Sequence, residues 1–128
     1  MKRYTRSAGL LKRIPSVRTA LFSKLGPGAR ISSHRGWADL ANHVLRVHLG
    51  LKVPPGERCA VWCDGEVECH RECDFLVFDD SKLHKAYNET GETRIVLIVD
   101  LARPPGMPRG RATGGRTPQL DDLIDFFS

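Results

Sequence analysis

Two histidines far apart in the chain, His34 and His84, are the side chains best suited by type to hold a metal ion. His84 follows the run Phe78-Asp79-Asp80-Ser81, which brings carboxylates close to it. Two histidines and one carboxylate on one face of a metal form the usual non-haem Fe(II) site. The chain has 5 histidines, so such a set arises easily by chance, and a histidine on a strand is more often a satisfied polar side chain. The assignment therefore depends on the elements that position these residues.

Short β-type runs dominate the chain from Ala29 onward, separated by Gly, Pro, Asn and Asp residues. The predicted strands are residues 44–51, 59–63, 75–78 and 94–101. They predict an antiparallel barrel or sandwich. Residues 5–23 carry apolar side chains near helical spacing that Pro15 interrupts, so one or two short helical turns are expected there.

Four stretches, in order along the chain, resemble the catalytic domain of the aspartyl/asparaginyl β-hydroxylase family. They are residues 20–36 with His34 and Gly36, Leu45-Arg46-Val47-His48-Leu49-Gly50-Leu51 with Pro54, Phe78-Asp79-Asp80-Ser81 before His84 and Asn88, and residues 94–100. A match in this order is hard to produce by chance. The resemblance implies a double-stranded β-helix (a cupin-like jelly roll), here all-β dominated with a short N-terminal helical segment. It also implies Fe(II), 2-oxoglutarate as co-substrate, and O2.

The resemblance gives His34 and His84 the role of the two iron ligands, which are also the catalytic residues. Gly36 falls where most related oxygenases keep a third, carboxylate ligand, and glycine has no side chain to offer. We therefore expect a carboxylate introduced at position 36 to reach the metal. Asp79 and Asp80 are interpreted as structural residues of an acidic turn.

Four further residues are matched to the 2-oxoglutarate site by the same resemblance. Arg94 and Ser23 correspond to residues at the distal carboxylate, and Arg46 and His48 to residues that approach the other end. Chemistry supports the arginines, because a guanidinium pairs with a carboxylate through two charge-assisted hydrogen bonds. The alternative is a surface charge at a strand end, although both arginines stand just inside apolar runs.

The chain departs from the family pattern at three places. An insertion after His34 includes Asp39, which is either a replacement carboxylate for the metal or, as we favour, a solvated loop residue. His70 and Cys73 stand where the family has tryptophan and glycine, and residues 102–104 replace its Trp-His-Pro. These departures weaken inference about the substrate more than inference about the metal.

The four cysteines have the form of two C-x3-C pairs, which raises a structural zinc site as an alternative. They are Cys59, Cys63, Cys69 and Cys73. In a hairpin centred on Glu66, Cys63 faces Cys69 and Cys59 faces Cys73, and the two levels lie about 13 Å apart, too far for one zinc ion. Two disulfides or four free thiols fit better, and free thiols are favoured in a reducing compartment.

Length and composition favour one domain. We predict an oxygenase-like domain at residues 1–109, then a flexible linker and a short amphipathic segment at 110–128 that docks on its own core or on a partner. The formal charge of +5 is concentrated at the two ends without aromatic residues that could stack on bases, so no specific nucleic-acid partner is expected. No transmembrane segment or signal peptide can be drawn, and an intracellular, cytoplasmic location is expected.

The sequence thus predicts an Fe(II)- and 2-oxoglutarate-dependent dioxygenase that hydroxylates an unactivated C–H bond. By resemblance, the substrate is the β-carbon of an Asp or Asn residue in a polypeptide. The alternatives are a small amino acid or a lipid acyl chain. Two rival functions are a non-catalytic metal-binding module built on the cysteines and a barrel that has kept the fold but only binds a partner. The oligomeric state is not predicted.

Overall fold

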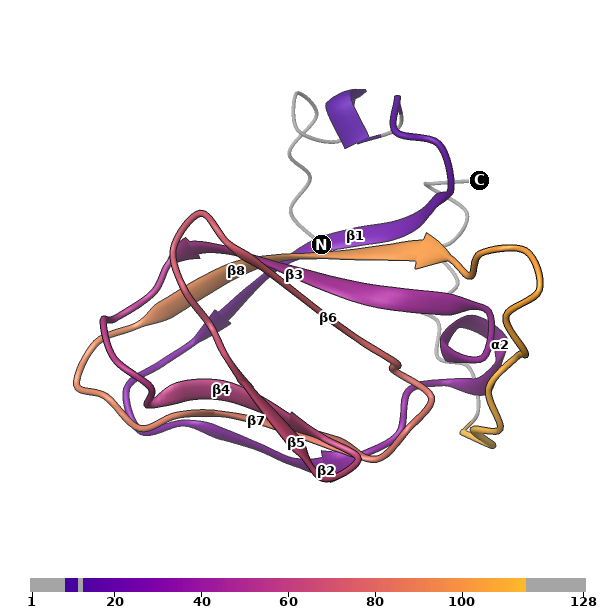
Figure 1. Cartoon of the computed structure of the whole chain (residues 1–128). Helices are drawn as coiled ribbons and strands as arrows, with labels where there is room; N and C mark the ends of the chain where they lie inside the picture. The colour runs from indigo at the N-terminus through magenta and orange to yellow at the C-terminus, as the bar shows by residue number, and fades with distance from the viewer. Residues whose placement is uncertain (1–8, 12, 115–128) are drawn as a thin grey trace.

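A computed structural model describes residues 9–11 and 13–114, which form two facing four-stranded antiparallel sheets (Figure 1). The first sheet has the order β1-β8-β3-β6 and the second the order β2-β7-β4-β5. The strands are β1 (Val17–Leu25), β2 (Arg30–His34), β3 (Val44–Lys52), β4 (Cys59–Cys63), β5 (Glu66–Cys69), β6 (Phe75–Phe78), β7 (His84–Asn88) and β8 (Arg94–Ala102). The chain passes repeatedly from one sheet to the other, as in a double-stranded β-helix, so the predicted fold class is confirmed.

Four predicted strands are present. β4 and β6 have the predicted bounds, and β3 and β8 each extend one residue further. Alternation is clearest in β8, where every second residue from Arg94 is buried. Because successive side chains on a strand point to opposite faces, these residues line the space between the sheets.

The helical prediction for residues 5–23 is wrong over its second half. Residues 9–11 are helical, but Val17–Leu25 is a strand that pairs along its length with β8. Its apolar spacing resembled a helix face, yet hydrogen bonding to a strand far away in the sequence outweighs this weak local preference. One short helix, α2 (Ala38–Ala41), fills the insertion after His34 and lies beside the first sheet (Figure 1).

The hairpin of β4 and β5 is tighter than the cysteine pattern predicted. Asp64 and Gly65 form the turn with φ angles of 49° and 91°, and Cys63 pairs with Glu66. Positive φ at both central residues matches the type I′ hairpin turn, for which Asp-Gly is a strong sequence signal. The predicted pairing of Cys63 with Cys69 is therefore wrong, since Ala60 is the partner of Cys69. All four cysteines are free thiols.

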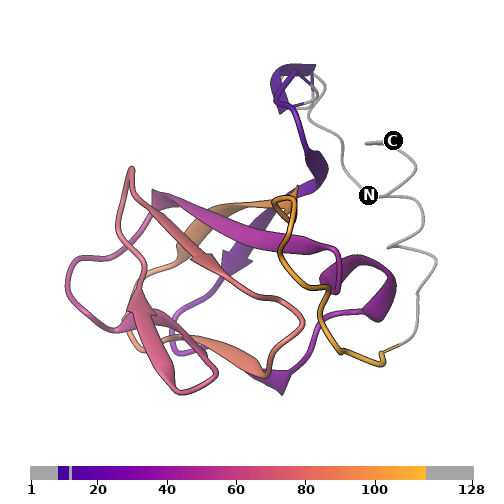
Figure 2. The ribbon, with the colours of Figure 1, turned by 45° about the vertical axis from the view of Figure 1, so that its right-hand side comes forward.

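The chain remains packed beyond the predicted domain boundary at Arg109. It descends from the end of β8 past α2 (Figure 2). Asn42 donates to the carbonyl oxygen of Ala112 (2.9 Å) and accepts from its amide (2.8 Å), and Ala112 is buried. Residues 110–114 thus pack on the α2 region, while the predicted amphipathic segment lies outside the described residues. Among the described residues, no helix is long and apolar enough to cross a bilayer.

The space between the sheets is unusually polar. A small apolar cluster of Val61, Leu76 and Ala86 occupies one part of it. Much of the remainder is lined by buried polar or charged side chains: Thr19, His48, His70, His84, Asn88, Arg94 and Asp100. Burying such groups costs free energy unless each finds a partner, so their partners indicate what this interior can hold.

Candidate functional site

His34 and His84 lie opposite each other on the neighbouring strands β2 and β7. Directly opposed residues of an antiparallel pair point to the same face, and the two ring centroids are 4.3 Å apart. His84 is buried and His34 is exposed. The structure therefore brings the two predicted metal ligands together, with one of them reachable from outside.

Both rings are held by backbone carbonyls of their own strand segments. Nδ1 of His34 lies 2.8 Å from the carbonyl oxygen of Ser32, and Nδ1 of His84 lies 2.7 Å from that of Lys82. A carbonyl only accepts, so Nδ1 of each ring carries a hydrogen, and Nε2 of a neutral His34 ring carries the lone pair. Nε2 of His84 instead faces Oδ1 of Asp80 and is placed to donate to it. For His34 this is the tautomer of a metal-ligating histidine whose second nitrogen is oriented by a carbonyl, whereas Nε2 of His84 would bind a metal only in place of its contact with Asp80.

Asp80 places a carboxylate beside the histidines. Its Oδ1 is 3.1 Å from Nε2 of His84 and 3.3 Å from Nη1 of Arg46. Burial by itself would raise the pKa of Asp80, but the contact with His84 and the positive charge of Arg46 outweigh burial and lower that pKa. Sequence reasoning treated Asp80 as structural. Its position four residues before His84 was the available signal for a role at the site.

Gly36 has no room for the carboxylate expected at its position. Its amide donates to the carbonyl oxygen of Asp80 (2.8 Å), which holds the two backbones together. A Cβ at position 36 would overlap Oδ2 of Asp80 and lie 2.7 Å from Cβ of Ala41. A carboxylate at position 36 could reach the metal only if Asp80 and Ala41 shifted, so that expectation stays a prediction.

The other candidate acids lie elsewhere. Asp39 is an exposed residue in the first turn of α2. Asp79 accepts from the amide of Ser81 (3.0 Å) and from Nη2 of Arg103 (2.6 Å), which fixes the turn before β7. In residues 9–11 and 13–114, no three His, Cys, Asp or Glu side chains are arranged to hold a metal ion. A metal bound by His34 and His84 would therefore need non-protein ligands to complete its coordination.

Arg46 is paired with two carboxylates, those of Asp80 and Asp100. Its Nε and Nη2 donate to the two oxygens of Asp100 at 2.8 and 3.0 Å, and Thr19 also donates to Asp100. Burial by itself would lower the pKa of Arg46, but the paired charge of Asp100 outweighs burial and raises it. Any co-substrate that meets Arg46 shares this guanidinium with Asp80 and Asp100.

Arg94 is buried without a counter-charge. It is only 1% exposed, and its Nη2 donates to Oγ of Ser23 at 2.9 Å. Nε and Nη1 are buried and have no partner. Burial lowers the pKa of this guanidinium. Since unpaired buried donors on a charged group are costly, this arrangement is expected where a protein binds an anionic ligand. The structure thus places the predicted pair of Arg94 and Ser23 in contact.

His48 lies in the same interior and contacts another histidine. Nδ1 of His48 is 3.0 Å from Nε2 of His70, and the ring of Phe78 meets the His48 ring edge-on with centroids 5.1 Å apart. Phe78 also contacts the ring of His84, again with centroids 5.1 Å apart. Phe78 therefore links the histidine pair to the predicted metal ligands. Sequence reasoning noted His70 as a departure from the family pattern but gave it no role, because its burial depends on the position of β5.

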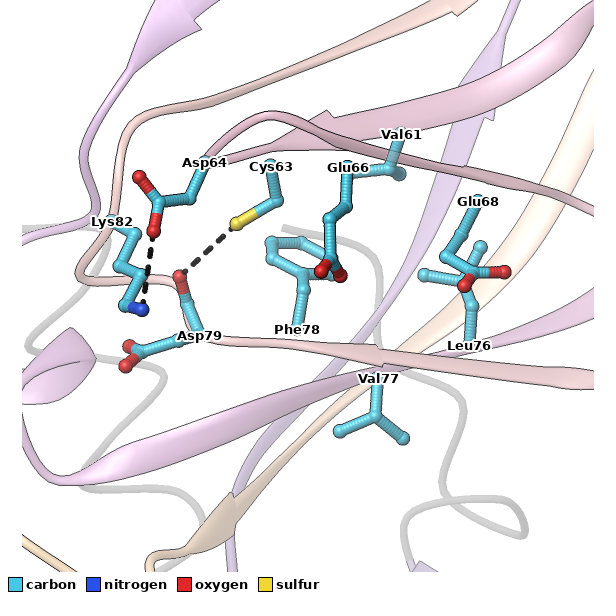
Figure 3. A pocket seen from close by; sticks show the side chains of 10 residues that line it. All are labelled: Val61, Cys63, Asp64, Glu66, Glu68, Leu76, Val77, Phe78, Asp79 and Lys82. Carbon is cyan, nitrogen blue, oxygen red and sulfur yellow. Dashed lines mark hydrogen bonds and ion pairs between the residues drawn. The ribbon is translucent and has the colours of Figure 1, made fainter.

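A pocket of about 210 Å³ opens between the β4-β5 hairpin and β6. Figure 3 shows Cys63, Glu66 and Phe78 pointing toward one another across it. Apolar side chains of Val61, Leu76 and Phe78 form part of the lining. Because Cys63 is the direct strand neighbour of His84, the pocket lies beside the candidate metal ligands.

The family model described as aspartyl/asparaginyl β-hydroxylase matches residues 1–104. The chain belongs to this family. It is 44% identical over 100 residues to an ornithine lipid ester-linked acyl 2-hydroxylase of Rhizobium tropici, covering 77% of this chain and 34% of that protein. It is 34% identical over 90 residues to human aspartyl/asparaginyl β-hydroxylase, covering 70% of this chain and 11% of that protein. The chain thus spans about a third or less of the length of these relatives, and both names describe hydroxylases.

Solved structures support the fold. The cupin domain of Schizosaccharomyces pombe Cnp3 matches with a TM-score of 0.53 at 11% identity, covering 70% of this chain and 58% of that one. A Cupin_2 domain of an XRE family transcriptional regulator from Enterobacter cloacae matches with a TM-score of 0.53 at 18% identity, covering 72% and 93%. At such identities the likeness shows a shared double-stranded β-helix and nothing about activity.

Proposed function

We propose that this member of a hydroxylase family works with Fe(II) and 2-oxoglutarate, and that His34 and His84 hold the iron. The observation that carries the proposal is the buried guanidinium of Arg94, which has two unpaired donors in the interior that His84 also lines, with His34 beside His84 at its edge. A dicarboxylic co-substrate satisfies both features, because one end can pair with Arg94 while the other meets the metal.

The chain's own residues would position the reactants. Arg94 and Ser23 bind the distal carboxylate, and His48 and Arg46 meet the other end. Asp80 and Asp100 balance the charge of Arg46, so Arg94 supplies the net positive charge that attracts the anion. Fe(II), when bound, would supply the oxidising chemistry that uses O2 and 2-oxoglutarate to hydroxylate a C–H bond.

Two substrate classes follow from the relatives and the pocket. The family name supports the predicted β-carbon of Asp or Asn in a polypeptide. The higher identity to an ornithine lipid acyl hydroxylase and the apolar side of the pocket beside His84 favour the acyl chain of an amino lipid as the second candidate. The cysteine-based metal module has less support, because Cys59 and Cys69 hydrogen-bond to Asn88 and to Glu57 instead of converging.

Turnover with defined reactants tests the proposal. The Fe(II)-loaded protein should convert 2-oxoglutarate to succinate only when O2 is present, and faster with the true substrate. Peptides containing Asp or Asn, and an ester-linked acyl ornithine lipid, are then compared for the gain of one oxygen by mass spectrometry. A folded protein that retains iron but neither binds nor consumes 2-oxoglutarate would contradict the proposal.

A further inference from the structure

His70 is a buried histidine to which neither the family resemblance nor the proposed function gives a role. It follows β5, is 2% exposed, and its amide donates to the carbonyl oxygen of Cys59 at 2.8 Å. Its Nε2 lies 3.0 Å from Nδ1 of His48, and the two ring planes are within 8° of parallel. His70 is therefore held through its backbone amide and through its ring, and the ring faces His48, a residue of the proposed co-substrate site.

Only one of the two ring nitrogens that meet, Nδ1 of His48 or Nε2 of His70, carries a hydrogen. Burial, helped by the positive charge of Arg94, lowers the pKa of His70 to about 4. Burial and the neighbouring His70 lower the pKa of His48 well below its ordinary value. Both rings are thus neutral near pH 7, so either Nδ1 of His48 donates to Nε2 of His70, or Nε2 of His70 donates to Nδ1 of His48.

The surroundings distinguish these two arrangements. If His48 were the donor, Nδ1 of His70 would carry a hydrogen, and this nitrogen is buried without a partner. Orphaned buried N–H groups are rarer than orphaned acceptors, so a lone pair is favoured at Nδ1 of His70. With His70 as the donor, Nε2 of His48 carries the hydrogen and can donate to an anion.

We propose that His70 is a positioning residue for the co-substrate: it donates from Nε2 to Nδ1 of His48 and so fixes the tautomer in which His48 presents an N–H to the 2-oxoglutarate carboxylate. The inference rests on the proposed function for the identity of the anion. The tautomer of His48 does not depend on that identity. A tryptophan, which the family pattern has at this position, can donate but has a different shape, so the pair is a feature of this chain.

Two substitutions separate donation from packing. His70→Phe keeps a planar ring but removes the donor, whereas His70→Gln keeps an N–H at about the reach of Nε2. We expect His70→Phe to weaken 2-oxoglutarate binding by about 3- to 10-fold, the cost of one neutral hydrogen bond, and His70→Gln to stay within about 2-fold of the parent. Iron affinity should not change, since His70 is not among the proposed ligands. The exposed His43 provides matched controls, His43→Phe and His43→Gln.

The measurements are 2-oxoglutarate titration of the anaerobic Fe(II) form and ¹⁵N NMR of the histidines, with Zn(II) as a diamagnetic replacement for Fe(II). The expected spectrum of the parent has a hydrogen on Nε2 of His48 and none on Nδ1. A parent with the hydrogen on Nδ1 of His48 overturns the proposal, and so does equal affinity in a folded His70→Phe protein. If His70→Phe does not fold, the tautomer of His48 in the parent spectrum and the 2-oxoglutarate affinity of His70→Gln still test the proposal. A parent that binds no 2-oxoglutarate refutes the proposed function, while the tautomer of His48 in the metal-free protein still tests His70.

Discussion

Replacing Arg94 removes the one buried guanidinium in the described interior that lacks a counter-charge. Its Nε and Nη1 have no partner, so both are available to a carboxylate. A hydrogen bond to a charged group contributes about 1.5 to 3 kcal/mol, so Arg94→Ala should weaken 2-oxoglutarate binding by roughly 10- to 100-fold. Arg94→Lys should recover only part of this loss, because an ammonium group does not reproduce the planar fork of a guanidinium.

The same variants should separate co-substrate binding from stability. In the ligand-free protein, Arg94 is a desolvated charge with unpaired donors, so Arg94→Met fills similar space without that cost. We expect the free energy of unfolding of the ligand-free Arg94→Met protein to equal or exceed that of the parent by up to about 2 kcal/mol, although 2-oxoglutarate no longer stabilises it. Iron retention should not change, because Arg94 is not among the proposed ligands.

The assay is anaerobic titration of the Fe(II) form with 2-oxoglutarate, accompanied by thermal unfolding with and without the ligand. Arg30, an exposed arginine paired with Glu89, provides the matched control, and Arg30→Ala should bind 2-oxoglutarate like the parent. Unchanged affinity in a folded Arg94→Ala protein would refute the assignment of the co-substrate to this guanidinium. Stability that falls by several kcal/mol in Arg94→Met would refute the view that the arginine is kept for a ligand.

Five other substitutions, at four positions, test the site and its surroundings. His34→Ala or His84→Ala should abolish Fe(II) retention, because each removes one of the two proposed protein ligands. Metal analysis after desalting measures this, and a variant that retains iron like the parent would show that the site is misplaced. Gly36→Asp should lower the free energy of unfolding by about 1 to 3 kcal/mol in chemical denaturation, because its Cβ overlaps Asp80. An unchanged free energy of unfolding together with tighter iron binding would instead support the expectation that a carboxylate at position 36 reaches the metal. Cys73 has a φ of 59°, a backbone conformation that glycine adopts more readily than other residues. Cys73→Gly should therefore raise the free energy of unfolding by up to about 1 kcal/mol, whereas Cys73→Ala should not. Equal effects of the two substitutions would exclude backbone strain as the cause.

The sequence by itself determined the elements whose signals are local. The strands β4 and β6 follow from short runs of β-forming residues between turn residues, and their bounds were predicted correctly. Motif order was enough to select His34, His84, Ser23 and Arg94 before any contact was known. The Asp64-Gly65 dipeptide is also a sequence signal for the hairpin turn, although the cysteine spacing led to a different predicted register of the hairpin strands.

Only the tertiary structure decided which of these residues meet and what lies between them. Val17–Leu25 is a strand because it hydrogen-bonds to β8, and no local pattern specifies a partner so far along the chain. Asp80 fills the space at Gly36, and His70 reaches His48 from just beyond the end of β5, because the fold brings together segments that are far apart in the sequence. Residue type and spacing therefore selected the candidate groups, whereas pairing and burial determined their partners and their protonation.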